Sequence, residues 1–133
     1  MATFTLSATL AKPYDDAVEA VRAALGQQGF GILTEIDLKA TLKAKLDVDV
    51  APQVILGACR PALAHEVLRI DPSIAAVLPC NVVVRALDEA TTLVEAFDPD
   101  AMIGLADNDA LHAVAADAKE RLTAALAALT QED

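Results

Sequence analysis

The sequence predicts one two-layer α+β domain, in which helices pack on one face of a five-stranded, at least partly antiparallel sheet. Three observations support this prediction. Five short segments carry strand-like patterns, four others carry a helical repeat of apolar residues, and the last two strand-like segments are close enough to form a hairpin. A chain of 133 residues can bury a core without a disulfide or a metal. Residues 1–133 therefore fit a single domain.

The strand-like segments differ in pattern. Residues 3–9 alternate Phe4, Leu6 and Ala8 with threonine and serine, which predicts a strand with one buried face. Residues 53–58 are almost continuously apolar, which favours a central strand. The other strands are expected at residues 30–37, 81–87 and 91–97, with the hairpin turn at residues 88–90.

Helices are expected between and after these strands. The first begins at Pro13 and ends at Gly29, a residue suited to a left-handed cap. Leucines at four-residue spacing, with lysines between them, predict a short amphipathic helix over residues 38–46. Two more helices are expected over residues 61–70 and 108–130.

The charge of the chain argues against two classes of partner. The formal net charge is -10, and residues 86–133 contain 11 acidic residues but only Lys119 and Arg121 as bases. Such an acidic surface repels phosphate backbones and anionic lipids, so we expect no nucleic acid and no membrane as partners. The simplest explanation of this negative charge is that it keeps an apolar protein in solution. The alternative is that it binds a cationic partner or a metal.

The apolar content points to self-association in a reducing compartment. Hydrophobic residues make up 55% of the chain, more than so small a core needs, so we expect a homodimer. Residues 1–12 lack the features of a signal peptide, and no apolar run is long enough to span a membrane. With two cysteines and no export signal, a cytoplasmic location with reduced thiols is expected.

Cys59 and Cys80 are the first candidate site. Cys59 lies where a buried strand meets a helix, and the helix N-terminus together with Arg60 would lower the pKa of its thiol. Cys80 would lie at the same end of the sheet if the two strands are antiparallel. The pair could then act in redox chemistry or hold a metal or cofactor, although its spacing of 21 residues matches no standard zinc pattern. Two buried, inert thiols are the alternative.

Glu35 and Asp37 are the second candidate site. Two residues apart on one strand, they share a face, and paired carboxylates can serve as acid and base. The alternatives are a solvated strand end and, for Asp37, the cap of the helix that follows.

The order of motifs resembles a known family. A helix ending at Gly29-Phe30 leads into a strand ending at Asp37, and later come the segments 57–61 (GACRP) and 78–84 (LPCNVVV). Over residues 4–105 this resembles the domain-of-unknown-function 302 family, which often has asparagine in place of Arg60. The resemblance implies a curved, mostly antiparallel sheet, similar to one repeat of the TATA-box-binding-protein fold, and a homodimer. It implies no activity.

Three functions follow from these observations. We expect first a cytoplasmic dimeric module that binds a small ligand or a partner protein without turnover, and we expect no cofactor. The second is a thiol-dependent redox or metal-handling protein that uses Cys59 and Cys80. The third is an enzyme that uses Glu35 and Asp37.

Overall fold

A computed structural model describes residues 3–104 and 108–130 of the chain. Five strands form one sheet in the order β1-β5-β4-β3-β2, and each neighbouring pair is antiparallel. The strands are β1 (Thr5–Leu10), β2 (Gly31–Asp37), β3 (Gln53–Cys59), β4 (Cys80–Ala86) and β5 (Thr92–Phe97). The α+β fold and its antiparallel sheet are thus confirmed, and β3 and β4 occupy central positions.

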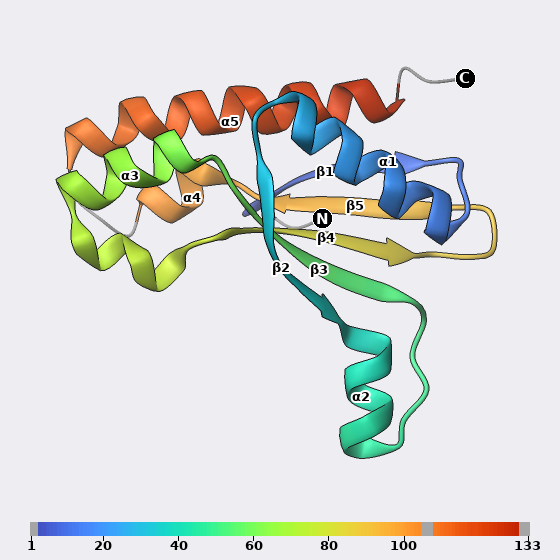
Figure 1. Ribbon diagram of the computed structural model, residues 1–133. Helices are drawn as coiled ribbons and strands as arrows, with labels where there is room; N and C mark the ends of the chain where they lie inside the picture. The colour runs from blue at the N-terminus through green and yellow to red at the C-terminus, as the bar shows by residue number, and fades with distance from the viewer. Residues whose placement is uncertain (1–2, 105–107, 131–133) are drawn as a thin grey trace.

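Helices cover one face of this sheet (Figure 1). The helices of the structure are α1 (Tyr14–Gln27), α2 (Leu38–Leu46), α3 (Pro61–Ile70), α4 (Pro99–Ile103) and α5 (Asp109–Thr130), with a 3-10 helix, η1 (Pro72–Val77), after α3; α2 is the one that does not cover the sheet (Figure 1). The long α5 packs along α1 and β1 of its own chain and also contacts α3 and α4. The acidic C-terminal helix therefore covers its own sheet.

The core lies between the helices and the sheet, because alternate strand residues face the helices. The central strands contribute Val54, Leu56, Ala58, Val82 and Val84, all at most 4% exposed. Phe4 differs from the sequence prediction: it precedes β1 and is 56% exposed, whereas Leu10, at the end of the same alternation, is buried. The alternation was correct, but helix α5 does not cover the first residue of the pattern.

A second apolar cluster occupies the end of the sheet near α3, α4 and η1. It consists of Val67, Ile74, Cys80, Met102, Leu111 and Ala115, each buried. These residues come from five separate elements, so the cluster joins the sheet end to the helices around it. The candidate site lies beside this cluster.

Helix α2 projects from the body on the ends of β2 and β3 (Figure 1). Its bounds match the prediction, and the carboxylate of Asp37 caps it by accepting a hydrogen bond from the amide of Ala40 at 2.9 Å. None of its residues is buried, however, and Leu46 is 67% exposed. The apolar side of this amphipathic helix is therefore left uncovered, and its main contacts are with β2 and β3. We call residues 33–48 the arm.

Among the described residues, the structure contains no helix long and apolar enough to cross a lipid bilayer.

Candidate functional site

An apolar cavity of about 40 Å³ lies where the ends of β3 and β4 meet α3, α4 and α5. A cavity needs roughly 10–15 Å³ by this measure to hold one water molecule, so this one has room for a small ligand. Its lining consists of Phe30, Ala58, Cys59, Arg60, Leu63, Ala64, Val67, Leu78, Cys80, Met102, Val114, Ala115 and Ala118. Arg60 is the charged residue of this set, and the rest are apolar or sulfur-bearing.

Both cysteines line this cavity. Cys59 is the last residue of β3 and Cys80 the first residue of β4, and because these strands are antiparallel the two lie at the same end of the sheet. In the register of the two strands, Cys80 is opposite Ala58, the neighbour of Cys59. Both thiols are free; Cys80 is buried and Cys59 is partly exposed. The structure thus brings the two predicted thiols to one cavity.

The predicted lowering of the Cys59 pKa is wrong. Burial raises the pKa of the Cys59 thiol above its ordinary value. Burial also raises the pKa of Cys80, to about 11, and the charge of a nearby Cys59 thiolate adds to that effect. Both groups are therefore thiols at neutral pH, and neither is an activated nucleophile.

The position of Arg60 explains why it does not activate Cys59. Its side chain lies against Gly29, where an added Cβ would come within 2.8 Å of the guanidinium Nε, and its Nη1 lies 3.6 Å from Asp117 of α5. The positive charge of Arg60 therefore faces the carboxylate of Asp117. Helix α3 also begins with Pro61, which has no amide hydrogen to offer a thiolate.

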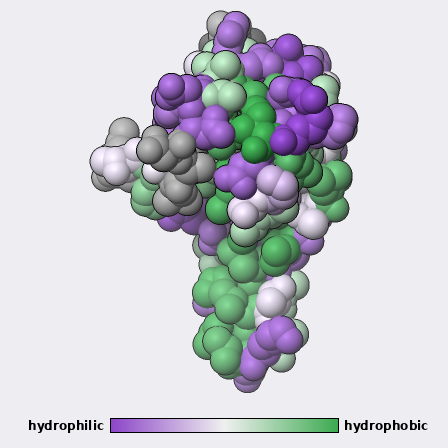
Figure 2. Space-filling model, turned by 90° about the vertical axis from the view of Figure 1, so that its left-hand side faces the viewer, coloured by the Kyte–Doolittle hydropathy of each residue, from purple (hydrophilic) through white to green (hydrophobic). Residues whose placement is uncertain are grey.

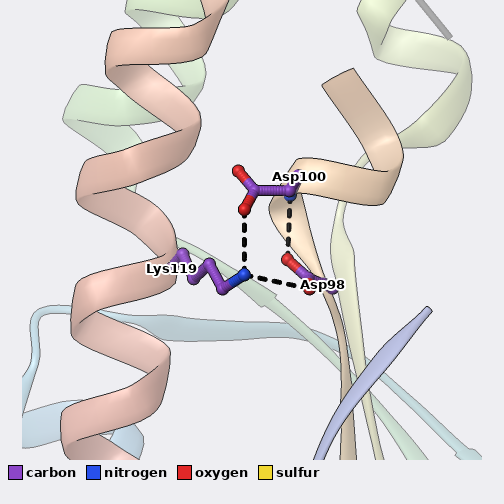
Figure 3. Close-up of polar contacts among 3 residues, drawn as sticks. All are labelled: Asp98, Asp100 and Lys119. Atoms are coloured by element: carbon purple, nitrogen blue, oxygen red, sulfur yellow. Dashed lines mark hydrogen bonds and ion pairs between the residues drawn. The ribbon is translucent and has the colours of Figure 1, made fainter. Parts of the chain in front are cut away.

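Helix α4 forms one wall of the cavity and carries Met102. The ammonium group of Lys119, on α5, lies 3.2 Å from a carboxylate oxygen of Asp98 and 2.8 Å from one of Asp100, as Figure 3 shows. Asp98 also caps α4 by accepting a hydrogen bond from the amide of Asp100. These charged contacts hold the five-residue α4 against α5 and thereby place Met102 in the cavity wall.

Glu35 and Asp37 lie elsewhere, on exposed β2. Glu35 forms an ion pair with Arg22 of α1, and Asp37 caps α2. Neither residue lines the apolar cavity. The structure thus gives each of the two carboxylates a partner of its own and keeps both apart from the thiols.

Comparison with known families now adds to this geometry. A family model described as "Domain of unknown function DUF302" matches residues 6–129. The chain belongs to the DUF302 family. The match covers more than the resemblance at residues 4–105 suggested, because it runs through most of α5. The thiols, the cavity and the clamped α4 all lie within the DUF302 region.

A solved DUF302 structure supports the fold over nearly the whole chain. The crystal structure of an uncharacterized conserved DUF302 protein from Bacillus stearothermophilus is 30% identical to this chain. The similarity covers 96% of this chain and 99% of that one, with a TM-score of 0.87. No curated protein matches the sequence.

Sequence reasoning named only Cys59, Arg60 and Cys80 as site candidates among the residues that line the cavity; of those it missed, Met102 is the one that carries sulfur. Residues 98–107 carry no clear helical or strand repeat, so nothing local shows that α4 turns this side chain into the cavity. The signal that could have found it is compositional. The chain has only two methionines and two cysteines, and a sulfur-bearing side chain outside the core stripes is a candidate partner for the thiols.

Proposed function

We propose that this protein is a binding module that holds a small, weakly hydrated ligand in the cavity between β3, β4, α3, α4 and α5, without turnover. The observation that carries the proposal is the cavity itself: it has a measurable volume, and its wall is almost entirely apolar or sulfur-bearing. Pockets with such walls favour small apolar or polarisable ligands, because these lose little hydration on entry.

The chemistry around the cavity favours binding over catalysis. Raised pKa values keep both thiols protonated at neutral pH, so they are poor nucleophiles and poor bases. Arg60 faces Asp117, and the carboxylates of Glu35 and Asp37 are engaged elsewhere. No acid–base pair therefore faces a ligand in this cavity. The free thiols also suit the reducing cytoplasm that we propose as the location of the protein.

Xenon tests the binding proposal because it is apolar, polarisable and small enough for such a cavity. We expect xenon-saturated buffer to shift the methyl NMR signals of lining residues such as Leu63 and Val114, with a saturable dependence on xenon pressure. Ala118→Leu should abolish the shifts, because it adds side-chain volume to the cavity wall. Ala116→Leu is the matched control: Ala116 lies on the same helix but is exposed. Shifts that do not saturate, or that survive in Ala118→Leu, would contradict the proposal.

We propose further that the module is a homodimer in which the arm of each copy packs on the other. Leu33, Ile36, Leu46 and Val48 of the arm are between 41% and 67% exposed. In Figure 2, hydrophobic colour gathers on the part that projects below the body, which is the arm. So much exposed apolar surface on a single projection is typical of an interface.

Charge complementarity favours a second copy as the occupant. The arm contains Lys39, Lys43 and Lys45, all exposed, whereas residues 86–133 are strongly acidic. Helix α2 of the arm carries these lysines and no acidic residue, so two copies can bring this helix of one to the acidic surface of the other, in a symmetric pair that closes on itself. The alternative is that the arm packs on a different protein that is equally acidic.

Sedimentation velocity at micromolar concentrations tests the dimer. We expect a species of twice the 13.8 kDa chain mass, and we expect Leu46→Asp to convert it to a monomer. Phe4→Asp is the matched control, since Phe4 is 56% exposed but precedes β1, outside both the arm and residues 86–133. A wild-type monomer would refute the self-association, and a dimer unaffected by Leu46→Asp would refute the role of the arm.

A further inference from the structure

The sulfur atoms of the described chain converge on one place. The sequence contains two cysteines and two methionines, and every one of them except Met1 lines the apolar cavity. Cys59 comes from the end of β3, Cys80 from the start of β4 and Met102 from α4. Three segments that are far apart in the sequence therefore each bring one sulfur-bearing side chain to the same space.

Two observations, besides the shared cavity, place these side chains in one region. Cys80 and Met102 pack in the same buried cluster, at the end of the sheet. Cys59 is near enough to Cys80 for the two thiolate charges to interact. Cys80 and Met102 are both buried, at 8% and 4% exposed, and share the cavity wall with Cys59.

The rest of the cavity wall offers no ligand for a hard metal ion. No histidine, aspartate or glutamate belongs to the lining, and Arg60 stays protonated and cannot bind a metal. Across residues 3–104 and 108–130, no group of three or more histidine, cysteine, aspartate or glutamate side chains could hold a metal. Zinc sites typically have four protein ligands from this set or three plus water, and calcium and magnesium need oxygen ligands, so the cavity fits none of these ions.

We propose that Cys59, Cys80 and Met102 bind one soft monovalent metal ion, Cu(I), in this cavity. Thiolate and thioether sulfurs select Cu(I) over harder ions, and a sheltered, apolar site preserves this oxidation state. This inference rests on the proposed binding function and names the ligand class of the same cavity.

The binding step balances without an oxidant or a reductant. Each thiol releases its proton to the solvent, both thiolate sulfurs bond to the ion, and the Met102 thioether donates a lone pair. Copper remains Cu(I) throughout. Two thiolates and one monovalent cation leave the site with a net charge of minus one, which is held next to solvent because Cys59 is partly exposed.

The competing explanation is that the three sulfurs only fill space, since methionine and free cysteine are common core residues. Metal binding separates the two explanations. Fully reduced protein is titrated under anaerobic conditions with Cu(I) held by the competing chelator bicinchoninate. With no tryptophan and one tyrosine in the chain, absorbance from thiolate–Cu(I) bonds in the near ultraviolet is easy to detect.

We expect one Cu(I) per chain. Cys59→Ser and Cys80→Ala should each weaken binding at least a hundredfold. Met102→Leu conserves volume and packing and should weaken it about tenfold, because only the thioether is lost. Far-UV circular dichroism verifies that each variant is folded. The proposal is overturned if wild-type protein takes no copper from bicinchoninate, if Met102→Leu binds within twofold of wild type, or if Zn(II) binds as tightly as Cu(I).

The xenon experiment on the same samples keeps the two proposals separate. If both are correct, Cu(I) abolishes the saturable xenon shifts, because ion and gas occupy the same cavity. Saturable xenon binding without copper binding refutes the metal site and leaves the binding module standing. Failure of both probes refutes the binding module and the metal site together.

Discussion

Gly57→Ala should destabilise the protein because a side chain at this position has no room. Gly57 lies in the centre of β3, opposite Thr34 of β2 and Asn81 of β4. A Cβ atom added there would come within 2.1 Å of the Thr34 hydroxyl oxygen and 2.7 Å of Cγ of Pro79. The register of β2 against β3 shifts between Ile32 and Thr34, just where this close approach occurs.

The size of the effect follows from two opposing terms. Overpacking a well-filled site costs about 1–3 kcal/mol, and two such short contacts place this site near the upper value. Replacing glycine also removes freedom from the unfolded chain, which offsets about 0.5–1 kcal/mol. We therefore expect the free energy of unfolding to fall by about 2 kcal/mol, which corresponds to roughly 8 °C in Tm for a domain of this size.

Urea unfolding followed by far-UV circular dichroism measures this change at a fixed protein concentration. In Gly57→Ala/Thr34→Ala the hydroxyl contact is gone and the Pro79 contact stays, so about half of the lost stability should return. Gly26→Ala is the matched control: nothing lies within 4 Å of a Cβ at this helical position, so it should not destabilise the protein. A Gly57→Ala midpoint equal to wild type, or no recovery in the double variant, would refute the steric explanation.

Three further predictions follow from other contacts. Thr92→Val should lower the free energy of unfolding by about 1 kcal/mol, because the hydroxyl of the fully buried Thr92 donates a 2.9 Å hydrogen bond to the carbonyl of Lys12. An unchanged midpoint of urea unfolding would contradict this prediction. The pKa of the Cys80 thiol is about 11 in the folded protein and 9.0 in an unfolded chain, so the unfolded chain loses this proton at lower pH. The free energy of unfolding should therefore fall as the pH rises from 9 to 11. Cys80→Ala should flatten that slope, and an equally steep slope in this variant would argue against the assignment. Lys119→Met should reduce hydrogen-exchange protection in α4 while leaving the midpoint of global urea unfolding nearly unchanged, whereas Arg121→Met, which breaks an ion pair within α5, should leave α4 protected as in wild type.

The fold could be predicted largely because its signals are local. The apolar repeat of α5 and the continuous apolar run of β3 each identify an element without knowledge of its neighbours. The hairpin of β4 and β5 follows from a short turn, and it fixes the antiparallel direction for one of the four strand pairs. These signals do not show whether a neighbouring element covers a residue, which is why Phe4 was expected on a buried face and why the exposure of helix α2 could not be predicted.

The site was harder to predict because it depends on contacts between distant segments. The two thiols could be placed at one end of the sheet by assuming antiparallel strands. The direction of the Cys59 pKa could not be predicted, since it depends on where the Arg60 side chain turns and how deeply the thiol is buried. Met102 required knowledge of α4, a five-residue helix without a sequence repeat that is held in place by Lys119 from another helix.

The clamp at Lys119 makes one wall of the cavity sensitive to ionic strength. The ion pairs of Lys119 with Asp98 and Asp100 are accessible to solvent, where dissolved ions screen them, whereas the apolar packing around the rest of the cavity gains strength in salt. We therefore expect concentrated salt to weaken the contact of α4 with α5 at Lys119, while the apolar packing of Met102 persists. A ligand bound beside α4 should then exchange with the medium faster in concentrated salt than in dilute buffer.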